Sequence, residues 1–186
     1  MDASRRLGLL AALAICALAF AACAARSVYS YVPRGADLSV YTRYSWGPAD
    51  RTGTGDPRLD NNQIFQERVQ SAVEKQLAAR GFEKTATESS DLLVHYHASV
   101  RQRIDLRDAE PSQPCPECKP FIYDAGTLVI DLVDVRAKTL VWRGWAEGNV
   151  EGVVDDQRWM EDRIDDAVMR IFERLPAGAR HSSARP

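Results

Sequence analysis

The run Leu92-Leu93-Val94-His95-Tyr96-His97-Ala98-Ser99-Val100-Arg101 decides the fold, because its apolar and polar side chains alternate. Successive side chains of a strand point to opposite faces of the sheet. One face would carry Leu92, Val94, Tyr96, Ala98 and Val100, and the other Leu93, His95, His97, Ser99 and Arg101. Such a pattern is typical of an antiparallel sheet with one side in water. We therefore expect a strand over residues 91–103, with His95 and His97 on the wet side.

A β-hairpin is predicted further along the chain. Residues 123–135 and 140–148 are rich in β-branched and aromatic side chains, and the short segment 136–138 joins them as a turn. Trp142 and Trp145 would point to opposite faces of the second strand. Gly144 and Gly148 share the Trp142 face, where they would let a ring or a helix approach the sheet closely. Residues 40–46 predict a further strand of similar composition.

Two amphipathic helices complete the pattern. The first follows Asp60-Asn61-Asn62 and ends at Gly81, and the second covers residues 155–175 and stops at Pro176. The order strand, helix, strand, hairpin, helix favours the α+β class over a doubly wound sheet. We expect about four mainly antiparallel strands with both helices packed on one face. Asp131 falls on an otherwise apolar strand face, where it is either a functional acid or the ion-pair partner of Arg103 or Arg143. We favour the ion pair, because buried charges are usually paired.

The N-terminus has the features of a bacterial lipoprotein signal. Arg5 and Arg6 precede sixteen almost purely apolar residues, 7–22, and the run ends in Ala21-Ala22-Cys23. This ending resembles a lipobox, which implies cleavage before Cys23 and acylation of that residue. Ala24 after the cysteine favours the outer membrane. The alternative is ordinary signal-peptidase cleavage after Ala22 or Ala25, with Cys23 incidental.

These features predict the organisation of the chain: a signal peptide over 1–22, a tether over 23–39, the α+β domain over 40–176 and a disordered tail over 177–186. Several motifs between residues 40 and 145 also resemble, in order, a bacterial lipoprotein family catalogued as domain of unknown function 4136. They are Tyr44-Ser45-Trp46, Asp56-Pro57-Arg58-Leu59-Asp60-Asn61, Ala79-Arg80-Gly81-Phe82, Asp91-Leu92-Leu93-Val94-His95-Tyr96-His97, Gly126-Thr127-Leu128-Val129-Ile130-Asp131 and Leu140-Val141-Trp142-Arg143-Gly144. The resemblance implies an α+β envelope domain, and it assigns no catalytic residue.

Cys115-Pro116-Glu117-Cys118 is the sharpest short motif in the chain. Export would place it in an oxidising compartment, so we expect Cys115 and Cys118 to form a disulfide. A metal site would need two more ligands, which His95 and His97 would have to supply. A redox dithiol normally opens a helix after a strand, whereas this motif lies between prolines in a loop. Alternatively, the two histidines are ordinary polar residues on the solvent-facing side of the strand and belong to no site.

Composition narrows the function only partly. The chain has 186 residues, 45% of them hydrophobic, and a formal net charge of −2, which argues against nucleic-acid binding. No Gly-x-Ser-x-Gly motif, phosphate loop or dinucleotide fingerprint occurs. We therefore expect a membrane-anchored periplasmic binding or scaffolding module that is not an enzyme and holds no cofactor. Its partners would be outer-membrane lipid through Cys23 and another envelope protein, lipid or glycan. The alternative is a metal- or redox-active envelope protein that uses Cys115, Cys118, His95 and His97.

Overall fold

The computed structural model describes residues 27–48, 52–105 and 121–176. The predictions for the signal peptide, Cys23, the Cys115–Cys118 pair and the tail at 177–186 lie outside these residues. The strands are β1 (Ser27–Tyr31), β2 (Arg43–Trp46), β3 (Glu83–Lys84), β4 (Leu92–Asp105), β5 (Phe121–Asp134) and β6 (Leu140–Asn149). The helices are α2 (Gln63–Ala78) and α3 (Gln157–Glu173), with short 3₁₀ turns η1 (Leu38–Val40), η2 (Thr87–Ser89) and η3 (Val153–Asp155).

The six strands form one mixed sheet in the order β1-β6-β5-β4-β2-β3. Pairing is antiparallel from β1 to β4, while β2 pairs in parallel with both β4 and β3. Parallel neighbours need a long crossover, and α2 supplies it between β2 and β3. The α+β class is confirmed, and all four predicted strands are present. The prediction of about four mainly antiparallel strands is inexact, because β1 and β3 extend the sheet at its two edges.

The strand β1 lies within residues 23–39, where a tether and no strand was expected. Its sequence Ser-Val-Tyr-Ser-Tyr is short, and four of its five residues are exposed. It therefore lacks the run of buried positions that marks a strand in a sequence. Antiparallel pairing with β6, from Ser27 opposite Glu147 to Tyr31 opposite Arg143, fixes it as the edge of the sheet.

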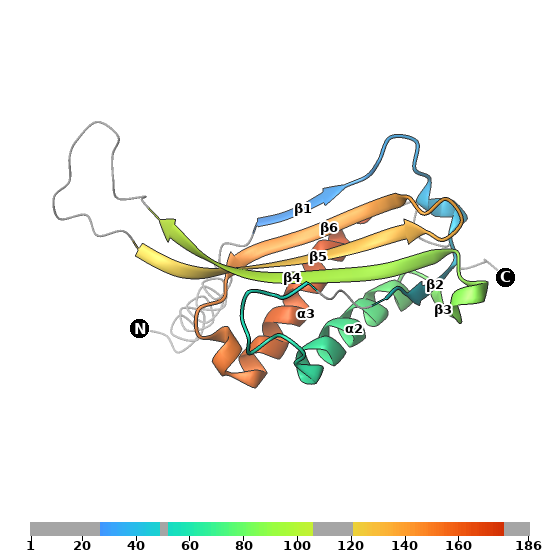
Figure 1. Ribbon diagram of the computed structural model, residues 1–186. Helices are drawn as coiled ribbons and strands as arrows, with labels where there is room; N and C mark the ends of the chain where they lie inside the picture. Colours follow the sequence, from blue (N-terminus) through green and yellow to red (C-terminus); the bar gives the residue numbers. More distant parts are fainter. Residues whose placement is uncertain (1–26, 49–51, 106–120, 177–186) are drawn as a thin grey trace, which may run out of the picture.

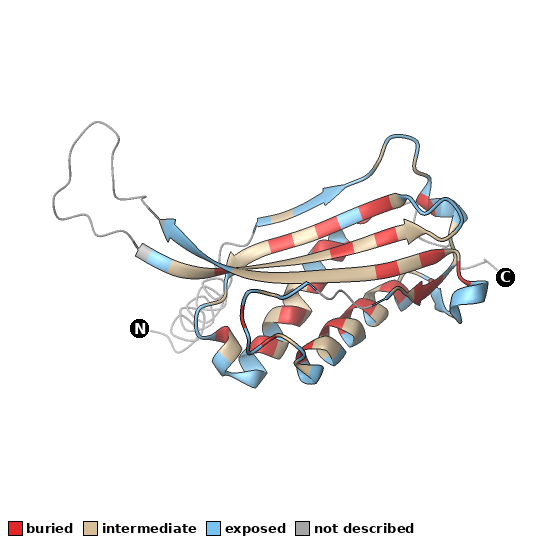
Figure 2. Ribbon diagram, viewed as in Figure 1, coloured by how far each residue is buried: buried red, intermediate tan, exposed pale blue. Residues whose placement is uncertain are grey.

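Both helices cover the same face of the sheet, and the hydrophobic core lies between the two layers (Figure 1). Buried residues recur along β4, β5 and β6, as Figure 2 shows, and most of them belong to one core cluster with buried residues of both helices. Trp142, Tyr44 and Phe172 are the largest fully buried side chains. The predicted apolar face of β4 is thereby confirmed, since Leu92 and Val94 are fully buried.

Helix ends follow the local sequence closely. The side chain of Asn62 accepts a hydrogen bond of 3.0 Å from the backbone N–H of Phe65 and caps α2. Gly81 ends this helix in the left-handed conformation, at φ +84°, and Phe82 folds back into the core, as predicted. Asp156 caps α3 in the same way, through the N–H of Trp159 at 2.9 Å.

Gly144 sets the distance between α3 and β6. A Cβ at this position would lie 2.5 Å from Cη2 of Trp142 and 2.6 Å from Cγ2 of Ile171 on α3. The absence of a side chain therefore lets the indole and Ile171 occupy this space, with the indole next to Phe172 at 5.6 Å between ring centroids. The predicted role of Gly144 in close packing is confirmed.

Candidate functional site

The second face of the sheet carries no described helix, and we call it the open face (Figure 1). Its side chains come from the odd-numbered positions of β4, β5, β6 and β1, which the strand register brings into common rows. One row holds His95, Asp131, Arg143 and Tyr31, and the next holds His97, Val129, Trp145 and Tyr29. The open face therefore combines aromatic, charged and imidazole groups on one surface.

Aromatic side chains gather at the β1 edge of the open face. Trp145 stacks on Tyr29 with ring centroids 5.3 Å apart and an interplanar angle of 25°. Tyr29 and the neighbouring Tyr31 are 47% and 53% exposed. Trp142 and Trp145 point to opposite faces of the sheet, as predicted. Trp145 packs against Tyr29 of β1. The sequence could not indicate this stack, because no strand was expected at β1.

Two ion pairs cross the same surface. Arg143 donates from Nε and Nη2 to the two carboxylate oxygens of Asp131, both at 2.6 Å. These hydrogen bonds raise the pKa of Arg143 above its usual value. Arg103 instead donates to Glu147 at 3.0 Å. The sequence left Arg103 and Arg143 open as partners of Asp131, and the structure selects Arg143.

His95 packs against the backbone of Gly47, which follows β2. A Cβ at Gly47 would lie 2.0 Å from Cε1 of the imidazole, so the ring occupies the space that any side chain would need. The N–H of Gly47 also donates to the carbonyl of Val94 at 2.9 Å. These contacts make His95 part of the β2–β4 junction on the open face.

His97 lies two residues further along β4. It lines a mostly polar hollow of about 230 Å³ between the edge of β4 and the loop that precedes α2. Within the described ranges, no three His, Cys, Asp or Glu side chains gather closely enough to hold a metal ion. Cys115 and Cys118 are not among these residues, so the disulfide and the metal- or redox-active alternative remain predictions.

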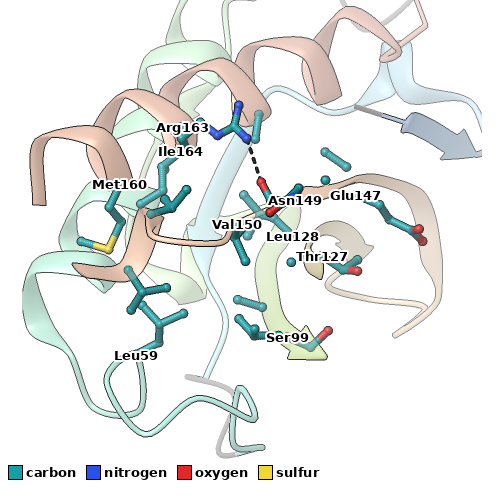
Figure 3. A pocket seen from close by; sticks show the side chains of 18 of the residues that line it. Leu59, Ser99, Thr127, Leu128, Glu147, Asn149, Val150, Met160, Arg163 and Ile164 are labelled. Carbon is teal, nitrogen blue, oxygen red and sulfur yellow. Dashed lines mark hydrogen bonds between the residues drawn. The ribbon is translucent and has the colours of Figure 1, made fainter. Parts of the chain in front are cut away.

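A second candidate site is an apolar pocket between α3 and the sheet (Figure 3). Its volume is about 100 Å³, which is smaller than the roughly 150 Å³ cavity that accepts benzene in an engineered protein. The pocket therefore has room for one small apolar group. Its lining includes Leu128, Val150, Met160 and Ile164, and Arg163 at its rim donates to the carbonyl of Asn149 at 2.7 Å.

The sequence did not predict this pocket, although one signal was present. Gly148 was expected to let a ring or a helix approach, and in the structure it lines the pocket instead. Gly126, opposite it on β5, is covered by Val150, since a Cβ there would lie 2.6 Å from Cγ1 of that valine. Gly126 and Gly148, which face each other on adjacent strands, therefore both line this pocket between α3 and the sheet.

The loop before α2 is fastened by a buried carboxylate. Asp56 accepts hydrogen bonds from the guanidinium of Arg58, at 3.0 Å from Nε and 2.6 Å from Nη2. Arg58 also reaches Asp155, which ties this loop to the segment before α3. The hydrogen bonds from Arg58 lower the pKa of Asp56 despite its burial. This cluster holds the two helix N-termini together, as a structural ion pair does.

A comparison with known protein families identifies the family of the chain. Residues 27–177 match the family described as "Domain of unknown function (DUF4136)". The chain belongs to the DUF4136 family. Its sheet edge β1 therefore lies inside the family domain. No curated protein matches the chain.

Solved structures resemble this DUF4136 domain at low sequence identity. A DUF4136 family protein from Bacteroides thetaiotaomicron gives a TM-score of 0.55 at 13% identity, covering 83% of this chain and 97% of that chain. A PDZ domain protein from Parabacteroides distasonis gives 0.54 at 12%, covering 81% of this chain and 36% of that chain. PelC from Paraburkholderia phytofirmans, a dodecamer, gives 0.47 at 13%, covering 84% of this chain and 100% of that chain. The likenesses to the Bacteroides and Parabacteroides proteins concern the fold alone.

Among the described residues of this DUF4136 domain, no helix is long and apolar enough to cross a membrane.

Proposed function

We propose that this DUF4136 protein is a lipoprotein of the outer membrane, acylated at Cys23, whose domain faces the periplasm as a non-catalytic binding module. The N-terminal motif supports the anchor, because a basic start, sixteen apolar residues and Ala-Ala-Cys are the signals that lipoprotein processing requires. Lipid chains at this point would hold the domain at the membrane surface by burying methylene groups, each worth about 0.8 kcal/mol.

One observation carries the binding role. Helices cover one face of the sheet, and the other face presents Tyr29, Tyr31 and Trp145 beside arginines that are ion-paired with carboxylates. Tyrosine, tryptophan and arginine are the residues most enriched at the centres of protein interfaces. An aromatic surface with ion-paired charges suits another folded protein of the envelope. We therefore propose a protein partner for the open face.

The state of the carboxylates supports a role without catalysis. Acid–base catalysis works best with groups whose pKa lies near the working pH. Hydrogen bonds from Arg58 instead lower the pKa of Asp56. This carboxylate therefore stays ionised at neutral pH and acts as a fixed charge that positions the loop before α2.

The anchor is tested by the intact mass of the mature protein. The wild type should begin at Cys23 and carry the mass of acyl chains, and it should fractionate with the outer membrane. Cys23→Ala should lose the added mass and either appear as soluble periplasmic protein or accumulate unprocessed. A wild-type protein without acyl chains would refute the anchor.

The open face is tested by photo-crosslinking in cells. A benzophenone amino acid in place of Tyr31, which is 53% exposed, should give a discrete protein adduct. Met169 on the outer side of α3 is 42% exposed and serves as the matched control. Equal adducts at both positions, or none at Tyr31, would contradict the proposed surface. Adducts to glycan or lipid alone at Tyr31 would contradict the choice of a protein partner.

A further inference from the structure

The apolar pocket beside α3 has a floor of small side chains. The strands β4, β5 and β6 contribute Ala98, Gly126, Ala146 and Gly148 to its lining. Side chains this small leave space between the sheet and the helix layer that larger ones would fill. The pocket is not enclosed, so this space is accessible from the surface.

Larger apolar side chains form the walls of the pocket. They come from the loop before α2, from α2, from the turn η3 and from α3, and they are Leu59, Phe65, Val153, Met160 and Ile164. All of them are buried members of the hydrophobic core. The core therefore holds the walls in place, as is typical of a binding pocket that is formed before its ligand arrives.

Arg163 of α3 places a positive charge at the rim of the pocket (Figure 3). Its Nη2 donates to the backbone carbonyl of Asn149 at 2.7 Å, which uses one of the five N–H donors of the guanidinium. In the part of the chain that the structure describes, Arg163 pairs with no carboxylate. The arginines that do pair with carboxylates there are Arg43, Arg58, Arg68, Arg103, Arg143 and Arg170. Arg163 therefore has donors available for an anion.

The other charged group of the described lining is already compensated. Glu147 contributes to the lining from β6, and its carboxylate accepts a hydrogen bond of 3.0 Å from Arg103. The charge left at the pocket is therefore the positive charge of Arg163. A ligand that complements this pocket combines an apolar part with an anionic group.

The volume of the pocket limits the apolar part of such a ligand. It is about 100 Å³, against the roughly 150 Å³ that accept the six carbon atoms of benzene. In proportion, the pocket takes up roughly four carbon atoms. A carboxylate suits the rim, because a guanidinium can bind both carboxylate oxygens with parallel hydrogen bonds.

We propose that this pocket binds a short aliphatic carboxylate of about five carbon atoms, with its alkyl chain between α3 and the sheet and its carboxylate on Arg163. Burial of the chain supplies the affinity, with a gain of about fourfold for each methylene group. Arg163 supplies the preference for an anion. The site lies on the helix-covered side of the sheet, so it depends neither on the lipid anchor nor on the open face.

The test is an NMR titration of the protein as cells process it, purified in lipid nanodiscs because detergent chains would compete for an apolar pocket. Pentanoate is the probe, and 1-pentanol is its uncharged match. Met160 lines the pocket and is 5% exposed, whereas Met169 on the outer side of the same helix is 42% exposed. Pentanoate should shift the methyl resonance of Met160 saturably and leave that of Met169 unchanged. Its affinity should exceed that of 1-pentanol by about fivefold, the upper range for an ion pair open to solvent.

The length of the acid is a second measurement. From propanoate to pentanoate, the affinity should rise about fourfold with each methylene group, and it should level off beyond hexanoate because the pocket is then full. An affinity that keeps rising to octanoate and decanoate would overturn the assignment of a short acid.

Variants separate the charge from the cavity. Arg163→Gln should lower the affinity for pentanoate about fivefold, to that of 1-pentanol, and leave the binding of 1-pentanol unchanged. Arg170→Gln is the matched control, since Arg170 lies on the same helix and pairs with Asp166, and it should change neither affinity.

Gly148→Val fills the floor of the pocket and should abolish the Met160 shifts with both compounds. Gly148 is not among the glycines with positive φ, so a side chain is compatible with its backbone. Circular dichroism checks that the variant is folded, and Gly148→Ala, which adds less volume, should shorten the preferred acid by about one carbon atom.

The remaining outcomes each overturn one part of the proposal. A wild-type protein that binds pentanoate and 1-pentanol equally, or an Arg163→Gln variant that binds pentanoate as the wild type does, would refute the carboxylate site. A Met160 resonance that no acid or alcohol shifts would refute binding in the pocket altogether. Folded Gly148→Val with unchanged shifts would place the binding elsewhere. None of these results bears on Cys23 or Tyr31, so the proposed anchor and protein partner are judged separately.

Discussion

Replacing Gly144 by alanine should destabilise the domain, because the added methyl group has no free space. Its Cβ would lie 2.5 Å from Cη2 of Trp142, 2.6 Å from Cζ2 of the same ring and 2.6 Å from Cγ2 of Ile171. Carbon atoms in contact normally stay about 3.5–4.0 Å apart. Trp142 and Ile171 are both fully buried, so neither can turn outward to relieve the overlap.

The expected cost follows from two opposing terms. Overpacking a core by one methyl group typically costs about 1–3 kcal/mol. Alanine also has less backbone freedom than glycine in the unfolded chain, which raises the unfolding free energy by about 0.5–1 kcal/mol. The overlap involves two fully buried side chains, which places the overpacking cost in the upper half of that range. Gly144→Ala should therefore lose about 1–2 kcal/mol of unfolding free energy, which for a domain of this size lowers Tm by roughly 2–8 °C.

The assay is urea and thermal unfolding followed by far-UV circular dichroism, with Trp142→Phe as the second arm of a double-mutant cycle. Phenylalanine lacks both ring atoms that the new methyl would strike. It also removes the indole N–H of Trp142, a buried donor that has no partner among the described residues. Gly144→Ala should cost less in the Trp142→Phe background, by about 0.5 kcal/mol or more. Equal costs in the two backgrounds, or a Gly144→Ala variant as stable as the wild type, would refute the packing argument.

Three further predictions concern single side chains. Asn62→Ala removes the cap of α2 and should cost about 1 kcal/mol, measured by urea unfolding. Asp134 accepts hydrogen bonds from the N–H of Ala137 and from the hydroxyl of Tyr41, and these bonds lower the pKa of Asp134 in the folded state. The ionised carboxylate therefore stabilises the fold fully above the unfolded pKa of about 3.9, and this stabilisation is lost as the pH falls below that value. Thermal melts of Asp134→Asn should consequently lose less stability between neutral pH and pH 2 than those of the wild type. Gly47→Ala should displace the imidazole of His95 while the domain stays folded, visible as a shift of the His95 ring resonances in NMR spectra.

The elements that bury a regular stripe of side chains could be predicted from the sequence. The apolar face of β4, the hairpin of β5 and β6, and both helices with their ends at Asn62 and Gly81 follow from periodicity and capping residues. These signals are local, because each residue's environment is determined by neighbours two to four positions away. The close approach at Gly144 was predictable for the same reason, since a glycine beside a core tryptophan marks missing volume.

The tertiary structure decided what local pattern cannot encode. β1 is an edge strand with little buried surface, and only its pairing with β6 makes it part of the sheet. The stack of Tyr29 on Trp145 depends on that pairing, and so does the choice of Arg143 over Arg103 as the partner of Asp131, since both depend on register across strands distant in sequence.

The sequence by itself therefore determined the class of the fold and its core, since burial leaves a periodic trace along the chain. Only the tertiary structure decided the open face and the pocket beside α3 with Arg163 at its rim. Which strands lie side by side is set by long-range pairing, and such pairing places exposed residues together without leaving a period in the sequence.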